Sequence, residues 1–205
     1  MLVIHGYPAG SGIAIGRAHL IRRNPSEVPQ ICLADGEIPA EAARFEAAVK
    51  TTRKQLEQIR SNIPENAPTE LGAFISLHLM LLTDATLSRE PIDIIEQQQI
   101  NAEWALKIQT ERLAQQFDEI DDEYLRQRKQ DMLQVVERIQ KNLIGQSTEL
   151  NLEGTLLDDI ILIAHDLSAA DTIHFKDQRI EGFVTDMGGP TSHTAILGRL
   201  SLIHI

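Results

Sequence analysis

The spacing of apolar residues changes twice along the 205-residue chain, and these changes predict three regions. Near the N-terminus, Ile13 and Ile15 alternate with small residues, which predicts a β-strand that bends at Gly16. From about residue 35 to residue 145 the apolar residues recur every three or four positions, as in amphipathic helices. From Leu150 onward a strand-like pattern returns.

The middle region is predicted to hold five helices joined by short loops, which indicates an antiparallel bundle. The first helix ends at Ile63, and the second begins near Thr69. Asp84 suits the N-cap of the third helix. If Pro91 lies inside that helix, its ring should kink or restart it.

The last two helices of this region have recognisable ends. Asn101 is expected to cap the fourth helix, with Trp104 and Ile108 facing inward. The fifth helix is expected over residues 122–143, and Gly145 fits the position after a helix C-terminus.

The C-terminal region alternates strand and helix, which is typical of an α/β unit. Residues 159–164 form a buried-strand pattern, Ser168 is a suitable cap for a short helix, and residues 182–185 form another strand. The N-terminal strand would complete this unit. We therefore expect a discontinuous α/β domain of residues 1–23 and 148–205, interrupted by a helical domain of residues 35–145.

The charge of the chain excludes some partners. A formal net charge of −11 argues against non-specific binding to nucleic acid or to an anionic membrane, and it favours a basic protein partner. Cys32 is the single cysteine, so an intrachain disulfide and a thiolate zinc cluster are excluded. No apolar run approaches the roughly 20 residues of a membrane helix, and no secretory signal pattern is present, so we expect a cytoplasmic protein.

The most informative stretch follows the last predicted strand and reads GGPTSHTAI from Gly188 to Ile196. Paired glycines let the backbone turn sharply, and a helix that opens on Thr191 and Ser192 presents free N–H groups to an anion. An imidazole beside a phosphate site, here His193, can accept a phosphoryl group on a ring nitrogen. The expected phosphate-binding residues are Gly188, Gly189, Thr191, Ser192 and Thr194.

Two other interpretations of this stretch remain. A glycine turn before a capped helix is common, and the histidine then has no chemical role. A hydrolase triad of Ser192, His193 and Asp186 fits less well, because adjacent helical side chains point about 100° apart and no Gly-x-Ser-x-Gly elbow is present.

The pattern GGxTSHxAI resembles the phosphohistidine signature of enzyme I, the phosphoenolpyruvate-protein phosphotransferase family of the bacterial sugar phosphotransferase system. The resemblance implies that His193 is phosphorylated and that Thr172 orients its ring. It also implies an α/β phosphohistidine domain interrupted by an inserted antiparallel helical bundle.

The resemblance extends to residues 78–84 and 121–128, in the helical region that docks the carrier protein HPr in this family. It implies a docking face that includes His78, Leu81, Leu82, Leu87 and Arg128. Apolar residues at such spacing are equally typical of a bundle core.

The chain departs from the family pattern in several places. Pro190 replaces an arginine, and Gly198 replaces an alanine, which should weaken the helix. The family's C-terminal barrel, which binds phosphoenolpyruvate and Mg²⁺, does not follow Ile205. We therefore expect this fragment to exchange phosphate only with phospho-HPr. The resemblance also implies that the full-length enzyme is a dimer. The other histidines have no ligand-spaced carboxylates, so no metal site is expected here.

Three alternatives stay open. The chain could belong to a nitrogen-related enzyme I paralogue or to a dikinase, although a phosphohistidine region at the N-terminus argues against dikinases. From a different class, it could be a non-catalytic helical interaction module.

Overall fold

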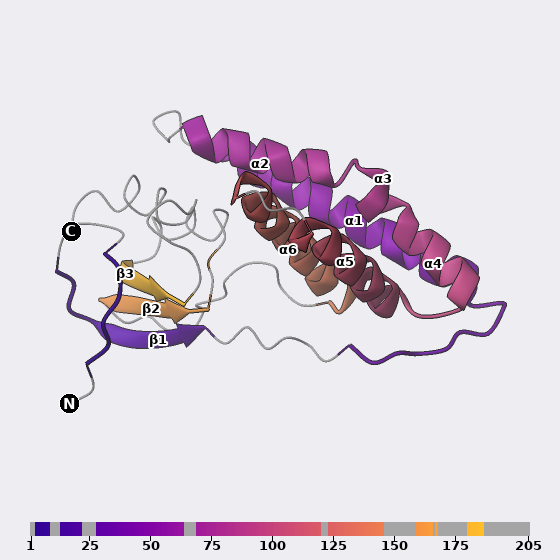
Figure 1. Ribbon diagram of the computed structural model, residues 1–205, viewed down its shortest axis with the longest axis horizontal. Coiled ribbons are helices and arrows are strands. Elements are labelled where there is room, and N and C mark those ends of the chain that lie inside the picture. The colour runs from indigo at the N-terminus through magenta and orange to yellow at the C-terminus, as the bar shows by residue number, and fades with distance from the viewer. Residues whose placement is uncertain are drawn as a thin grey trace. The chain divides into compact units, whose positions relative to one another are not determined.

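The computed structural model describes residues 3–8, 13–21, 28–63, 69–119, 123–145, 159–165, 167 and 180–186. By its internal contacts the chain falls into two compact units. The first comprises Met1–Pro25, Ile63–Gly72 and Glu149–Ile205, and the second comprises Ser26–Asn62 and Ala73–Thr148. The described part of the protein is thus helical with a small parallel sheet (Figure 1).

The sheet of the first unit has three strands in the order β1-β2-β3. These are β1 (Arg17–Ile21), β2 (Ile160–Ala164) and β3 (Ile180–Thr185), and both pairs are parallel. The wholly apolar sequence of β2 is typical of a central parallel strand. β1 pairs with β2 although all the helices of the described residues lie between them in the sequence.

One face of this sheet forms a small core. Because side chains alternate along a strand, every second residue of β2 points to the same side. The buried residues are Ile160, Leu162, Ala164, Leu167 and Ile180, against which Ile21 and Phe183 pack. On the other face Leu20 and Val184 are 55% and 52% exposed.

The predicted bend at Gly16 marks the start of β1 rather than its middle. A Cβ at Gly16 would overlap the backbone oxygen of Asp159, so only glycine permits this approach. The next amide, that of Arg17, donates to the same oxygen at 2.8 Å. The prediction that the strand includes Ile13 and Ile15 was wrong, because both precede the paired residues and are exposed.

The described residues of the helical region form six helices rather than the five predicted. They are α1 (Ile38–Ser61), α2 (Thr69–Leu81), α3 (Ala85–Ser88), α4 (Glu90–Gln98), α5 (Ala102–Asp118) and α6 (Glu123–Leu143). Helices α1, α5 and α6 pack on one another, and α4 packs on both α1 and α5 (Figure 1).

Several predicted helix ends are confirmed. The Asp84 carboxylate accepts a hydrogen bond from the Thr86 amide at 2.9 Å and caps α3. Pro91 lies in the first turn of α4, where its missing N–H costs nothing, and so it restarts the helix. Gly145 follows α6 with a φ of 68°, the left-handed conformation that glycine adopts readily.

The core of the helical unit differs from the prediction on α5. Phe45, Leu56 and Ile139 are fully buried. On α5 the buried side chains are Ala102, Ala105, Leu106 and Gln109, whereas Trp104 and Ile108 are only half-buried. The Lys107 ammonium lies 4.1 Å from the centre of the Trp104 ring, a cation–π contact at the edge of the core.

Candidate functional site

The carboxyl ends of β2 and β3 lie next to each other in the first unit. The ladder ends with a hydrogen bond from the Asp186 amide to the oxygen of Ala164, at 3.3 Å. One residue beyond each strand, His165 Nδ1 lies 3.2 Å from Asp186 Oδ2. Both side chains are exposed, at 63% and 76%. In parallel α/β sheets, ligands bind outside this edge.

The predicted phosphate site follows this edge in the sequence. Asp186, one residue beyond β3, precedes Gly188 by two residues. The residues predicted for catalysis and phosphate binding lie outside the described part of the chain: Thr172, Gly188, Gly189, Thr191, Ser192, His193 and Thr194. Their roles stay predictions.

The residues predicted for partner docking lie in the described part of the helical region. His78, Leu82 and Leu87 are buried, with 3%, 1% and 1% of their surface exposed. The His78 ring packs against Phe74, with the ring centres 4.2 Å apart. These side chains therefore contribute to the packing of the helices, as apolar positions at this spacing often do.

The other two predicted docking residues are closer to solvent. Leu81 is half-buried beside Met80, which is 61% exposed. The Arg128 side chain is 34% exposed, and its guanidinium lies 3.8 Å from the carboxylate of Asp131. The docking role of all five residues stays a prediction.

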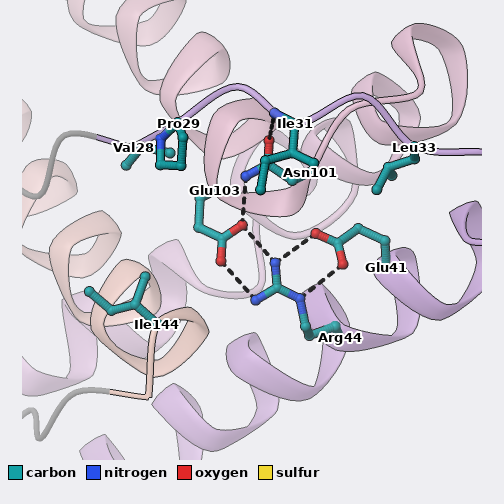
Figure 2. A pocket seen from close by; sticks show the side chains of 9 residues that line it. All are labelled: Val28, Pro29, Ile31, Leu33, Glu41, Arg44, Asn101, Glu103 and Ile144. Atoms are coloured by element: carbon teal, nitrogen blue, oxygen red, sulfur yellow. Dashed lines mark hydrogen bonds and ion pairs between the residues drawn. The ribbon is translucent and has the colours of Figure 1, made fainter.

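A cavity of about 380 Å³ in the helical unit contains a charged cluster that the sequence analysis missed (Figure 2). Arg44 of α1 lies between the carboxylates of Glu41 and Glu103 and bonds to each through two nitrogens, at 2.6–2.9 Å. It also donates to the backbone oxygen of Leu143 at 3.0 Å. The cavity is lined by Val28, Pro29, Ile31, Leu33, Glu41, Arg44, Asn101, Glu103 and Ile144.

The electrostatics of this cluster favour the charged state of all three groups. The pKa of Glu41 is lowered, chiefly by the hydrogen bond from Arg44 and against the effect of burial. Burial, the largest single effect on Glu103, would raise its pKa, but hydrogen bonds from Arg44, the backbone and Asn101 outweigh it and the pKa is lowered. The two carboxylates raise the pKa of Arg44. The cation is thus fully satisfied within the protein, which identifies a structural cluster rather than a ligand site.

The same cluster explains how α5 begins. Asn101 occupies the N-cap position, but its side chain makes no capping bond. Its oxygen accepts instead from the amide of Ile31 at 2.9 Å, which attaches the extended segment before α1. The carboxylate of Glu41 accepts from the amide of Ala102 at 2.7 Å and satisfies the first turn of α5.

Within the described residues, no group of three His, Cys, Asp or Glu side chains could hold a metal ion. No single described helix has the length and apolar composition of a membrane span. The bent pair Thr69–Leu81 and Ala85–Gln98, with 63° between the two parts, does pass that test of length and composition.

Two protein families match the chain over most of its length. The family described as PEP-utilising enzyme, N-terminal, matches residues 5–128. The family described as PEP-utilising enzyme, mobile domain, matches residues 156–202, which include the glycine motif.

Curated relatives share one name, phosphoenolpyruvate-protein phosphotransferase. The protein of Cupriavidus necator is 44% identical over 203 residues, which cover 96% of this chain and 35% of the relative. The Haemophilus influenzae protein is 33% identical (96% and 34% covered), and the Bacillus subtilis protein is 31% identical (97% and 34% covered). The chain thus spans about a third of the length of these relatives.

Two solved structures are similar in fold as well as in sequence. A solution structure described as Enzyme I (nEIt) has a TM-score of 0.73 and 33% identity, covering 93% of this chain and 76% of that one. A structure described as the N-terminal domain of Enzyme 1 - Nitrogen has a TM-score of 0.66 and 26% identity, covering 94% and 78%.

Proposed function

Because the chain belongs to the family of PEP-utilising phosphoenolpyruvate-protein phosphotransferases, or enzyme I, we propose that it carries a phosphoryl group on His193. In the whole protein this group comes from phosphoenolpyruvate and passes to the carrier protein HPr during sugar uptake. The observation that carries the proposal is the position of the glycine motif, directly after the carboxyl end of β3 in a parallel sheet.

The proposed reaction requires few catalytic groups from this chain. Phosphoryl transfer needs an aligned nucleophile and hydrogen-bond donors for the phosphoryl oxygens. A neutral nitrogen of His193 attacks phosphorus as the donor's bond to phosphorus breaks, and Thr172 orients the ring. The backbone amides around Thr191, Ser192 and Thr194, together with Gly188 and Gly189, hold the phosphoryl oxygens.

The domain organisation follows from the same family. We assign residues 1–23 and 148–205 to the phosphohistidine domain, into which a helical domain of residues 35–145 is inserted. The parallel pairing of β1 with β2 supports this assignment, because it joins the two ends of the chain in one sheet.

The helical domain is proposed to dock HPr. Leu81 and Arg128 offer accessible surface, whereas His78, Leu82 and Leu87 are buried and would support that surface from beneath. The net charge of −11 suits a basic partner, which is steered toward an acidic surface.

Magnesium and phosphoenolpyruvate are assigned to the remainder of the whole protein. The described residues contain no group of three metal-ligating side chains, so they give no reason to place Mg²⁺ in this part of the chain. The ion would supply positive charge for the reaction with phosphoenolpyruvate. A cytoplasmic location and a dimeric full-length enzyme belong to the same proposal.

The test uses labelled phospho-HPr, prepared with a separate full-length enzyme I and then purified. Mixed with the 205-residue chain, it should transfer label to the wild type but not to His193→Ala. His5→Ala, at an exposed position, serves as a histidine control that keeps the label. Equal labelling of wild type and His193→Ala would contradict the proposal, and binding of HPr without label would favour the interaction module.

The nitrogen-related branch is the second candidate, favoured by the fold similarity to the Enzyme 1 - Nitrogen domain. Phospho-HPr from the sugar branch and from the nitrogen branch, compared at equal concentration, separates the two. We expect faster transfer from the sugar-branch carrier.

A further inference from the structure

The contact between His165 and Asp186 has no part in the function described so far. The two residues lie 21 positions apart and meet one step beyond the last paired residues, Ala164 and Thr185. Neither residue belongs to the sheet core. His165 is the first residue after β2, and Asp186 is the first residue after β3. The segment after His165 includes Thr172, and the segment after Asp186 includes His193.

The contact requires a proton on Nδ1 of the imidazole. An aspartate carboxylate accepts hydrogen bonds, so at a distance of 3.2 Å the Nδ1 atom of His165 must be the donor. A neutral ring that carries its proton on Nδ1 keeps an unprotonated Nε2. The contact therefore selects one tautomer as well as joining two strands.

We propose that His165 and Asp186 are a positioning pair, which holds together the starts of the two segments that carry Thr172 and His193. The inference rests on the proposed function, because it concerns the alignment of His193 with the phosphoryl donor. The last backbone hydrogen bond between β2 and β3 is long, at 3.3 Å, so the side-chain contact adds a second tie where the chains separate.

The pair should affect transfer far more than folding. Exposed ion pairs contribute little to stability, and both side chains here are more than half exposed. In contrast, a misplacement of about 1 Å in a reacting group can lower a rate by about 100-fold. Loss of the pair is thus expected to lower the transfer rate by about 10- to 100-fold with an unchanged melting temperature.

The rate experiment measures single-turnover transfer from phospho-HPr to the chain as a function of phospho-HPr concentration. His165→Ala and Asp186→Ala should each lower the maximal rate and leave the half-saturating concentration unchanged, since HPr docks elsewhere. The double variant should be no slower than either single one. The exchanged variant, His165→Asp with Asp186→His, should recover most of the rate, and Glu181→Gln on β3 is the matched control.

A second readout does not depend on transfer. Nitrogen NMR of the histidine rings should show His165 protonated on Nδ1 in the wild type, and this preference should be lost in Asp186→Ala. An unchanged tautomer in Asp186→Ala, or wild-type rates in both alanine variants, would contradict the positioning role of His165 and Asp186. Neither result would contradict the proposed function. A wild type that takes no label at all would overturn the proposed function and this inference with it.

Discussion

Replacement of Arg44 by alanine tests the energetics of the helical unit most sharply. The substitution removes a guanidinium that makes four hydrogen bonds to Glu41 and Glu103 and one to the oxygen of Leu143. It leaves two carboxylates, whose side chains are only 14% and 12% exposed, facing each other without a cation. Glu41 must also continue to cap α5 through Ala102.

The expected loss in free energy of unfolding follows from two opposing effects. Removing one partner of a buried ion pair costs roughly 3–5 kcal/mol, because the remaining charge stays desolvated. The Arg44 side chain is 38% exposed, so solvent screening reduces this figure. We expect Arg44→Ala to lower the free energy of unfolding by about 2–3 kcal/mol at neutral pH.

The loss of stability in Arg44→Ala should be larger at neutral pH than at low pH. Folding lowers the pKa of both glutamates, so their contribution to stability is present above the unfolded value, near pH 4.3. It disappears as the pH falls through the lowered folded-state values. The difference between wild type and Arg44→Ala should therefore be largest near neutral pH and should shrink below about pH 4.

The assay is urea unfolding followed by circular dichroism at a series of pH values. Arg89→Ala is the matched control, since its ion pair with Asp93 is 3.1 Å long but exposed, and it should cost less than about 1 kcal/mol. A loss at Arg44 no larger than at Arg89, or one that does not depend on pH, would refute this reasoning.

Three further changes have defined outcomes. Gly16→Ala should unfold the small sheet, because its Cβ would clash with the oxygen of Asp159; normal melting would contradict this close approach. Asp84→Ala should cost about 1 kcal/mol in urea unfolding through loss of the α3 cap, and a cost near zero would show that its bond to Thr86 adds nothing. Arg128→Glu should weaken HPr binding in calorimetry without changing the fold, and unchanged affinity would remove this residue from the docking surface.

Local sequence signals predicted much of the helical region correctly. The N-cap at Asp84, the restart at Pro91 and the left-handed Gly145 each depend on a local backbone preference of one residue type. The phosphate site predicted at the glycine motif lies outside the described residues and stays a prediction.

What the sequence could not predict depends on contacts between distant segments. Arg44 meets Glu103, which is 59 residues away, and His165 meets Asp186 only through the parallel register of β2 and β3. The buried face of α5 was misjudged at Trp104, because small residues and Gln109 fill the space against neighbouring helices. No periodicity shows which of several apolar faces a neighbouring helix will cover.

The most direct test of the account is to locate the phosphoryl group on the phosphorylated chain. After reaction with phospho-HPr, ³¹P NMR and tandem mass spectrometry should find one acid-labile phosphoryl group on a ring nitrogen of His193. A phosphoryl group on another residue, or none on a chain that binds HPr normally, would contradict the central claim.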